Sequence, residues 1–280
     1  MRVYRMHWSL HPHRDLEWYR KQCERLRQDE VAKDLDISYL GAVSSKVFPQ
    51  FDHRKHVISR FPQIPSKATI YRIWDFGGVN CVLYVYITPN GHKRILHERI
   101  LQPSDSNGNS LITQAETAMR DSAQLFPQCE FFDICDPAGS YKGYNTYASD
   151  VEILNNQYGV YPSYQRINSL PKQTRKKDSI TYVQSDLELS PSGKESIQIY
   201  CAGELGCPTV VRAFAGGYSY KKDSRGNTDY SRINEKHPYE DVMDCIFYLY
   251  QELALDSTSN GISETITATE YQPIYRGKYF

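Results

Sequence analysis

The spacing of apolar residues along this chain predicts a buried sheet. Residues 69–76 and 79–87 are almost continuously apolar, as strands are when both faces of a sheet are covered. The turn signal at 89–91 (Pro-Asn-Gly) then predicts a hairpin that leads into a third strand at 94–101. Two more strands are expected, at residues 130–135 and 196–200.

Apolar positions at helical spacing predict the helices. They are expected at residues 15–26, 111–126, 147–158, 209–215 and 238–255. The last of them is clearly marked, because Pro238 stands in its first turn and Glu240 and Asp241 complement the helix dipole. Strands alternating with helices predict an α/β fold, in which helices flank a mixed β-sheet.

Three stretches interrupt this pattern. The basic stretch 170–178 is expected to be a loop, and residues 217–236 a polar excursion. Residues 180–189 fit either a helix or a hairpin, because their apolar spacing is too short to decide.

The distribution of prolines and polar residues predicts the domain organisation. Two prolines within 61–65 block both helix and central strand, which indicates a linker. We therefore expect a leader at residues 1–66, one compact domain at 67–255 and a polar C-terminal tail at 256–280.

Three aspartates stand at or within the expected apolar elements. Asp75 lies at the end of the first strand, Asp136 follows the apolar stretch 131–135, and Asp244 lies inside the last helix. A buried carboxylate without a partner is strongly unfavourable, so each of these acids needs a cation. Three carboxylates brought together by the fold predict a divalent-metal site, which is the arrangement that metal-dependent phosphodiester cleavage requires.

Asp75 and Asp136 also have a structural interpretation, whereas Asp244 lies within the buried stripe of its helix and has none. Asp75 would be a strand-end acid solvated at the glycine turn, and Asp136 a turn-initiating residue. Asp133 competes with Asp136, although their odd separation places them on opposite faces of a strand. Asp241 shares a helical face with Asp244 and serves either the helix dipole or a metal ion.

Basic residues concentrate in the expected loops. They are Lys142, Lys172, Arg175, Lys176, Lys177, Lys221, Lys222 and Arg225. Such runs are usually solvated surface, but beside an acidic metal site they are candidates for binding DNA phosphates. Because the formal net charge is +0, any DNA-binding surface must be local.

Composition and missing motifs exclude several other classes. The 7 cysteines lack paired spacing, which indicates reduced thiols and argues against a zinc site. GxxxxGK[ST], GxSxG and HExxH are absent, so the sequence predicts no P-loop ATPase, α/β-hydrolase or zinc-protease site. No apolar stretch approaches the ~20 residues that cross a bilayer, and no signal peptide opens the chain; a soluble, cytoplasmic protein is expected.

Several short motifs, taken in order, resemble the C-terminal nuclease domain of the large terminase subunit of tailed phages. Trp74-Asp-Phe-Gly is similar to the first nuclease strand, and Cys135-Asp-Pro-Ala-Gly, followed by Ser149-Asp-Val-Glu-Ile-Leu, to the second acidic motif. The segment from His237 to Leu249 is similar to the closing motif, although the family usually has Asp-Ala where this chain has Asp-Cys. Residues 1–66 resemble the segment at the end of a terminase ATPase domain.

The resemblance implies an RNase H-like fold and a metal-dependent endonuclease that cuts concatemeric viral double-stranded DNA during genome packaging. Asp75, Asp136 and Asp244 would bind two Mg²⁺ or Mn²⁺ ions, with Asp241 as an accessory. It also implies a place in the host-cell cytoplasm at the procapsid portal, with a portal protein and a small terminase subunit as partners.

The family carries an N-terminal P-loop ATPase, and this chain shows no such motif. We therefore expect a split gene or a fragment of a longer protein, no ATP hydrolysis by this chain, and a separate ATPase domain or polypeptide as partner.

Two other functions fit the same residues. A resolvase or integrase of RNase H-like fold would use the same carboxylates for nuclease or strand-transfer chemistry. A packaging-motor module would dock on the portal or on DNA without cutting either.

Overall fold

The structure, a computed structural model, describes residues 11–25, 45–77, 79–101, 111–142, 148–164, 172–188, 196–223 and 228–259. The chain divides into two units. One comprises Gln50–Val211 and His237–Phe280 and contains the sheet; the other comprises Met1–Pro49 and Arg212–Lys236.

The larger unit is built on one mixed sheet, as the apolar runs predict. The strands are β1 (Val57–Ile58), β2 (Thr69–Asp75), β3 (Asn80–Ile87), β4 (Lys93–Leu101), β5 (Glu130–Cys135), β6 (Ile197–Ala202) and β7 (Leu205–Gly206). Their order in the sheet is β1-β6-β4-β3-β2-β5, with β7 paired to β6. Pairing is antiparallel for β2–β3 and β3–β4 and parallel for β2–β5, β4–β6 and β1–β6.

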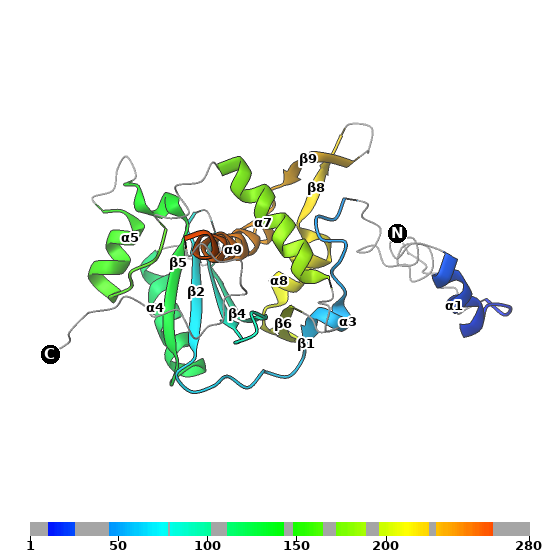
Figure 1. The fold of residues 1–280 in the computed structure, drawn as a ribbon, viewed down its shortest axis with the longest axis horizontal. Coiled ribbons are helices and arrows are strands. Elements are labelled where there is room, and N and C mark those ends of the chain that lie inside the picture. Colours follow the sequence, from blue (N-terminus) through cyan, green and yellow to red (C-terminus); the bar gives the residue numbers. More distant parts are fainter. Residues whose placement is uncertain are drawn as a thin grey trace, which may run out of the picture. The chain divides into compact units, whose positions relative to one another are not determined.

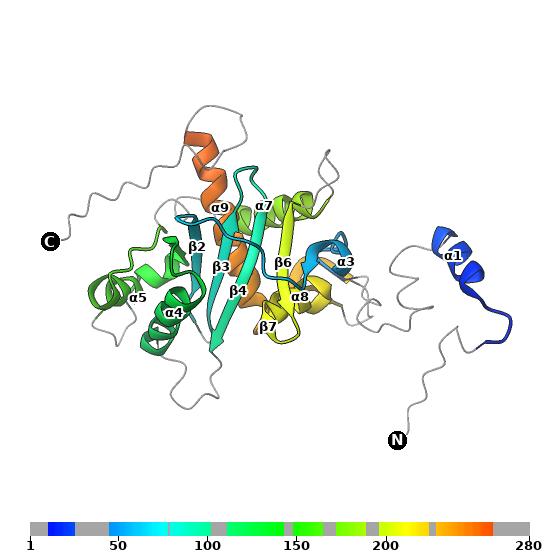
Figure 2. The same cartoon turned by 90° about the horizontal axis from the view of Figure 1, so that it is seen from below.

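Alternation along β2 assigns its side chains to two covered faces. Trp74 is fully buried in a core cluster with Ala115 and Ala118 of helix α4 (Leu111–Leu125). Asp75, one residue later, points the other way, because successive strand residues alternate between faces. Helix α9 (Tyr239–Ser259) packs there against β2, β3 and β5, and Figure 2 shows it behind the strands.

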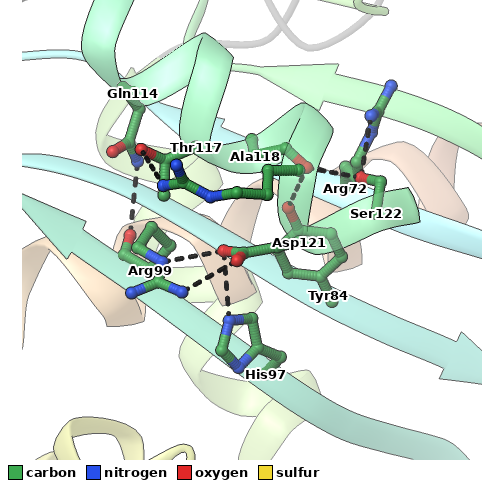
Figure 3. Close-up of polar contacts among 10 residues, drawn as sticks. Arg72, Tyr84, His97, Arg99, Gln114, Thr117, Ala118, Asp121 and Ser122 are labelled. Atoms are coloured by element: carbon green, nitrogen blue, oxygen red, sulfur yellow. Dashed lines mark hydrogen bonds and ion pairs between the residues drawn. The ribbon is translucent and has the colours of Figure 1, made fainter. Parts of the chain in front are cut away.

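A polar network ties α4 to its face of the sheet (Figure 3). Arg99 of β4 donates to both carboxylate oxygens of Asp121, at 2.7 and 2.8 Å. The Tyr84 hydroxyl donates to the Ala118 carbonyl oxygen at 2.9 Å. Buried polar groups that keep such partners fix one packing of helix on sheet.

Local capping signals explain where the helix α5 (Asp150–Ile153) begins and its continuation ends. Ser149 and Glu152 form a capping box, in which the Ser149 hydroxyl accepts from the Glu152 backbone and the Glu152 carboxylate accepts from the Ser149 backbone. The helix continues as a π-helix, η4 (Leu154–Tyr158), and ends at Gly159, whose φ of 64° is left-handed.

Helix α7 (Lys172–Leu187) corrects the expectation of a basic loop at 170–178 and decides the open choice at 180–189 in favour of a helix. Its apolar stripe is sparse, so periodicity alone was a weak signal. Contacts with α9 stabilise it: the Gln251 side-chain amide donates to the Ser179 hydroxyl at 2.9 Å, and the Tyr250 hydroxyl donates to Asp186 at 2.6 Å. Tertiary packing thus outweighs weak local propensity.

The remaining short elements of the larger unit are α3 (His53–His56), the 3₁₀ helix η3 (Pro137–Ser140) and α8 (Pro208–Arg212), whose last residue belongs to the other unit. The Glu98 carboxylate accepts from the backbone N–H groups of Thr209 and Val210, at 2.7 and 2.9 Å. This contact fixes the start of α8 against β4.

The smaller unit contains α1 (Leu16–Arg25), the π-helix η5 (Ala213–Gly217) and a hairpin of β8 (Ser219–Lys222) and β9 (Thr228–Asn234). Phe48 packs against Phe214 and Tyr218, with ring centroids 5.0 and 6.2 Å apart. The hairpin shows that the segments 219–222 and 228–234 of the polar stretch expected at 217–236 are β-strands; none of the β9 residues is buried, so the β9 sequence lacks apolar alternation.

Within the described ranges, no helix has the length and apolar character that crossing a membrane requires.

Candidate functional site

Asp75 lies at the carboxyl end of β2 on the α9 face of the sheet. Its side chain is buried, and the Tyr248 hydroxyl of α9 donates to its Oδ1 at 3.4 Å. Burial raises the pKa of Asp75 well above its usual range, and the negative charges of Asp244, Asp136 and Asp241 raise it further. Asp75 is therefore the centre of an acidic cluster.

Asp244 enters the cluster from α9, one turn before Tyr248. Its side chain keeps 23% exposure, and its Oδ1 lies 3.6 Å from the Lys176 ammonium of α7. Burial raises the pKa of Asp244 to about 7; the Lys176 charge lowers it, and the charges of Glu240, Asp136 and Asp241 raise it. Near neutral pH the Asp244 carboxyl is therefore only partly ionised.

Asp136 is held beside β2 by its own backbone. Its N–H donates to the Trp74 carbonyl oxygen at 3.0 Å, immediately after the parallel pairing of β5 with β2 ends. Its side chain also accepts from the Ala138 N–H at 3.0 Å and caps η3. Asp136 thus both caps the turn that follows β5 and contributes negative charge near Asp75.

Asp133 lies on the opposite face of the sheet, in a buried ion pair with Arg72. Its carboxylate accepts from Arg72 Nε at 2.8 Å and Nη2 at 2.7 Å, and from the Trp74 indole N–H at 2.7 Å. All three side chains are buried. The odd separation of Asp133 and Asp136 predicts that their side chains point to opposite faces of the sheet. In the structure the Asp136 charge raises the pKa of Asp75, whereas Asp133 pairs with Arg72 on the other face.

Asp241 is buried at the start of α9 and accepts from His237 Nδ1 at 2.9 Å. This hydrogen bond raises the pKa of the His237 imidazole. Asp241 also contributes negative charge at Asp75 and Asp244. It therefore belongs to the electrostatic environment of the cluster while holding a partner of its own.

Asp150 belongs to the segment 149–154, which resembles part of the second acidic motif, although it was not predicted as a site residue; the structure places it near Asp136. Burial raises the pKa of Asp150, and the Asp136 charge raises it further. Asp150 also lines a cavity of about 250 Å³ together with Phe76, Gly77, Asn80, Leu111, Ala138 and Gly139. Its position in the first turn of α5, two residues before the capping-box glutamate, also fits an ordinary helix-dipole acid, which is why the spacing alone does not mark it as a site residue.

The oxygen-only composition of the cluster suits hard divalent cations such as Mg²⁺ and Mn²⁺. In the part of the chain that the structure describes, the acids around Asp75 outnumber the cation beside them, the Lys176 ammonium at Asp244, and a divalent ion would supply the further positive charge. Among the described residues, no group of three or more His, Cys, Asp or Glu side chains is arranged to hold a metal ion as it stands. Without a metal ion, the acids repel one another and Asp244 pairs with Lys176, and both effects favour carboxylates that stay apart.

The predicted DNA-binding residues lie on different elements. Arg175, Lys176 and Lys177 follow one another on α7, and Lys172 begins it, rather than lying in a loop. Lys142 pairs with Glu152, with Nζ 3.3 Å from Oε1. Lys221 and Lys222 are exposed on β8 of the smaller unit, and Arg225 lies outside the described residues.

The raised pKa of Asp244 predicts a pH dependence of stability. Without metal, the unfolded state ionises Asp244 near its usual value of 3.8, whereas the folded state holds the proton until about 7. The folded state thus binds more protons in this window, and stability falls as pH rises through it, by at most about 1.4 kcal/mol per pH unit for one group. Urea unfolding in EDTA at several pH values should show this slope, and Asp244→Asn should flatten it. An equal slope in Asp244→Asn would contradict the assignment.

No protein-family model and no curated protein matches this chain. Several solved structures are similar to this chain. The large terminase of a thermophilic bacteriophage is 15% identical, with a TM-score of 0.51 over 86% of this chain and 53% of that one. The same terminase in complex with ADP gives 15% identity and a TM-score of 0.52 over 84% and 51%. The nuclease domain of the P22 large terminase gives 14% identity and a TM-score of 0.50 over 76% of this chain and 94% of that domain.

These similarities show the fold. The chain has the RNase H-like fold of terminase nuclease domains, a mixed sheet flanked by helices, which confirms the fold class expected from its sequence. Its resemblance to terminase nuclease domains, expected from short motifs, is confirmed at the level of structure. The chain spans about half the length of the thermophilic-phage terminase chains that it matches.

Proposed function

We propose that this chain is a terminase-type nuclease, a metal-dependent endonuclease that cuts concatemeric viral double-stranded DNA during genome packaging. The observation that carries the proposal is Asp75: a buried acid at the end of a central strand, surrounded by the charges of Asp136, Asp241 and Asp244. Such an arrangement destabilises the folded protein, so folding does not explain it. Acids with strongly shifted pKa values cluster at functional sites. The fold shared with the P22 nuclease domain supports the same assignment.

In this mechanism Asp75, Asp136 and Asp244 hold two Mg²⁺ or Mn²⁺ ions. When bound, such ions supply an activated water and stabilise the charge on the leaving oxygen of the phosphodiester. The chain positions the ligands: the Tyr248 hydroxyl orients Asp75, and the backbone bond from Asp136 to Trp74 fixes the second acid beside the first. The hydrogen bond from His237 to Asp241 stabilises the start of α9. Asp241 is an accessory acid, which adds negative charge to the cluster without being one of the three ligands.

The direct test of this function is nicking of supercoiled plasmid by the purified chain. We expect conversion to open-circular DNA with Mg²⁺ or Mn²⁺, none with EDTA, and no requirement for ATP. Metal-dependent DNA binding without cutting would instead favour a packaging-motor docking module. Strand joining in place of simple hydrolysis would favour a strand-transferase of the same fold.

We also propose that the chain works with partners. The large terminase chains of the thermophilic phage are about twice as long as the region matched here, and one was solved with ADP. A P-loop ATPase, as a further domain or a separate polypeptide, would complete the motor, together with a portal protein and a small terminase subunit in the host cytoplasm. Co-purification of the chain with such an ATPase is the check.

The basic side chains near the first turns of α7 should bind DNA phosphates irrespective of the base sequence. Arg175 is half-buried and Lys177 exposed on this helix, whose Lys176 reaches Asp244. Arg175→Ala with Lys177→Ala should weaken DNA binding for any sequence and flatten the slope of log affinity against log salt by about one unit per lost phosphate contact.

The matched control is Lys55→Ala. Lys55 lies on α3, next to the other end of α7, where His56 Nε2 lies 3.0 Å from the Leu187 carbonyl oxygen. This change should leave the salt slope as it is. A double variant that keeps the full slope would show that this end of α7 does not contact DNA.

A further inference from the structure

Helix α7 is anchored on α9 by one side. Ser179 and Asp186 accept from Gln251 and Tyr250 of α9, and Val183 between them is fully buried. Lys176 lies three residues before Ser179, so it continues this contacting stripe toward the first turns of α9. Figure 1 shows the two helices side by side in the larger unit.

The ammonium of Lys176 lies between two carboxylates of α9. Its Nζ is 3.5 Å from Glu240 Oε1 and 3.6 Å from Asp244 Oδ1. All three side chains are largely shielded, with exposures of 30% for Lys176, 18% for Glu240 and 23% for Asp244. This is a shielded contact at the acidic cluster, unlike an exposed surface pair, which solvent screens.

A divalent ion on Asp244 and the Lys176 ammonium compete for the same negative charge. Carboxylate oxygens bind Mg²⁺ at about 2.1 Å, so an ion on Asp244 would lie within roughly 6 Å of an unmoved ammonium. Like charges at that separation, away from bulk water, repel strongly. Lysine suits such an exchange, because its ammonium is a compact charge on a flexible stem.

We propose that Lys176 is the resident counter-cation of the Asp244–Glu240 carboxylate pair, and that metal ions must displace its ammonium to occupy this side of the cluster. Lys176 is thus a positioning residue that sets metal affinity: it holds the two acids together in the metal-free protein and leaves Asp244 when the ion arrives. This inference rests on the proposed function, because it takes Asp244 as a metal ligand.

The test is calorimetric titration of Mn²⁺ into the metal-free full chain, which measures affinity without DNA or turnover. Lys176→Met removes the competing charge and keeps a long side chain, and should tighten Mn²⁺ binding roughly two- to fivefold, the range that the loss of one partly exposed ion pair allows. Lys55→Met removes a lysine charge from the Asp52 pair on α3 and should leave the Mn²⁺ affinity unchanged. Lys176→Gln serves as the second substitution if the Met variant does not unfold cooperatively.

The outcomes separate the inference from the proposed function. Tighter binding in the Lys176 variants alone supports the inference. Equal or weaker binding in them, with clear binding by the original chain, overturns it and leaves the metal site standing. Absence of Mn²⁺ binding in all variants overturns the proposed function and the inference with it.

Discussion

Asp75→Asn is expected to abolish DNA cleavage while the protein stays folded. The substitution removes a ligand from the centre of the cluster and keeps the shape of the side chain, so the contact with Tyr248 and the end of β2 are preserved. Changes to groups that only support metal ligands already cost 10–100-fold, so loss of a ligand should lower the cleavage rate by at least about 100-fold.

The stability of the same variant gives an independent readout. Because burial and three neighbouring acids raise the pKa of Asp75, its ionised form is destabilising in the metal-free protein. Asp75→Asn should therefore unfold in EDTA at the same urea concentration as the original chain, or a higher one. Glu130→Gln, at the exposed start of β5, is the control that removes one acid away from the cluster. An Asp75→Asn protein that folds and still cuts would show that Asp75 is not a required metal ligand, and one that cannot fold would show that the acid is structural.

Asp133→Ala is expected to destabilise the protein strongly, by about 3–5 kcal/mol, because it leaves the Arg72 guanidinium buried without its carboxylate. Urea unfolding measures the change. The double variant Arg72→Met with Asp133→Leu should recover much of the loss, since an apolar pair of similar volume replaces a buried ion pair at little cost.

Asp136 provides the contrast to Asp133. Its side chain is half-buried and caps only the short helix η3, so Asp136→Ala should cost about 1 kcal/mol in stability, as the loss of one cap does, yet abolish cleavage. If Asp133→Ala were as stable as the original chain, the separation of the two acids into a structural and a functional role would fail.

The parts of the fold that could be predicted are those whose sequence is decisive by itself. The near-continuous apolar residues of β2 and β3 can only be buried in a sheet, and the Pro238 and Glu240–Asp241 signal marks the start of α9. Helix α7 could not be predicted in the same way, because its anchors Ser179 and Asp186 are polar and their partners lie on another helix. The hairpin of β8 and β9 was missed because its exposed strands lack apolar alternation.

The candidate site shows the same division. Asp75, Asp136 and Asp244 could be proposed from the sequence because each stands beside or within an apolar element, where an acid is conspicuous. The neighbours that modify them could not: Tyr248 reads as one more core aromatic, and Asp150 as an acid of a helix N-terminus. The pairing of Lys176 with Asp244 depends on how α7 lies against α9, which no local pattern encodes.

Anomalous scattering from crystals of the chain soaked in Mn²⁺ would locate the bound ions. We expect anomalous density in contact with the carboxylates of Asp75, Asp136 and Asp244, with the Lys176 ammonium moved away from Asp244, and loss of that density in Asp75→Asn. Mn²⁺ bound only elsewhere, with Asp75 and Asp244 untouched at saturating metal, would contradict the proposed metal site.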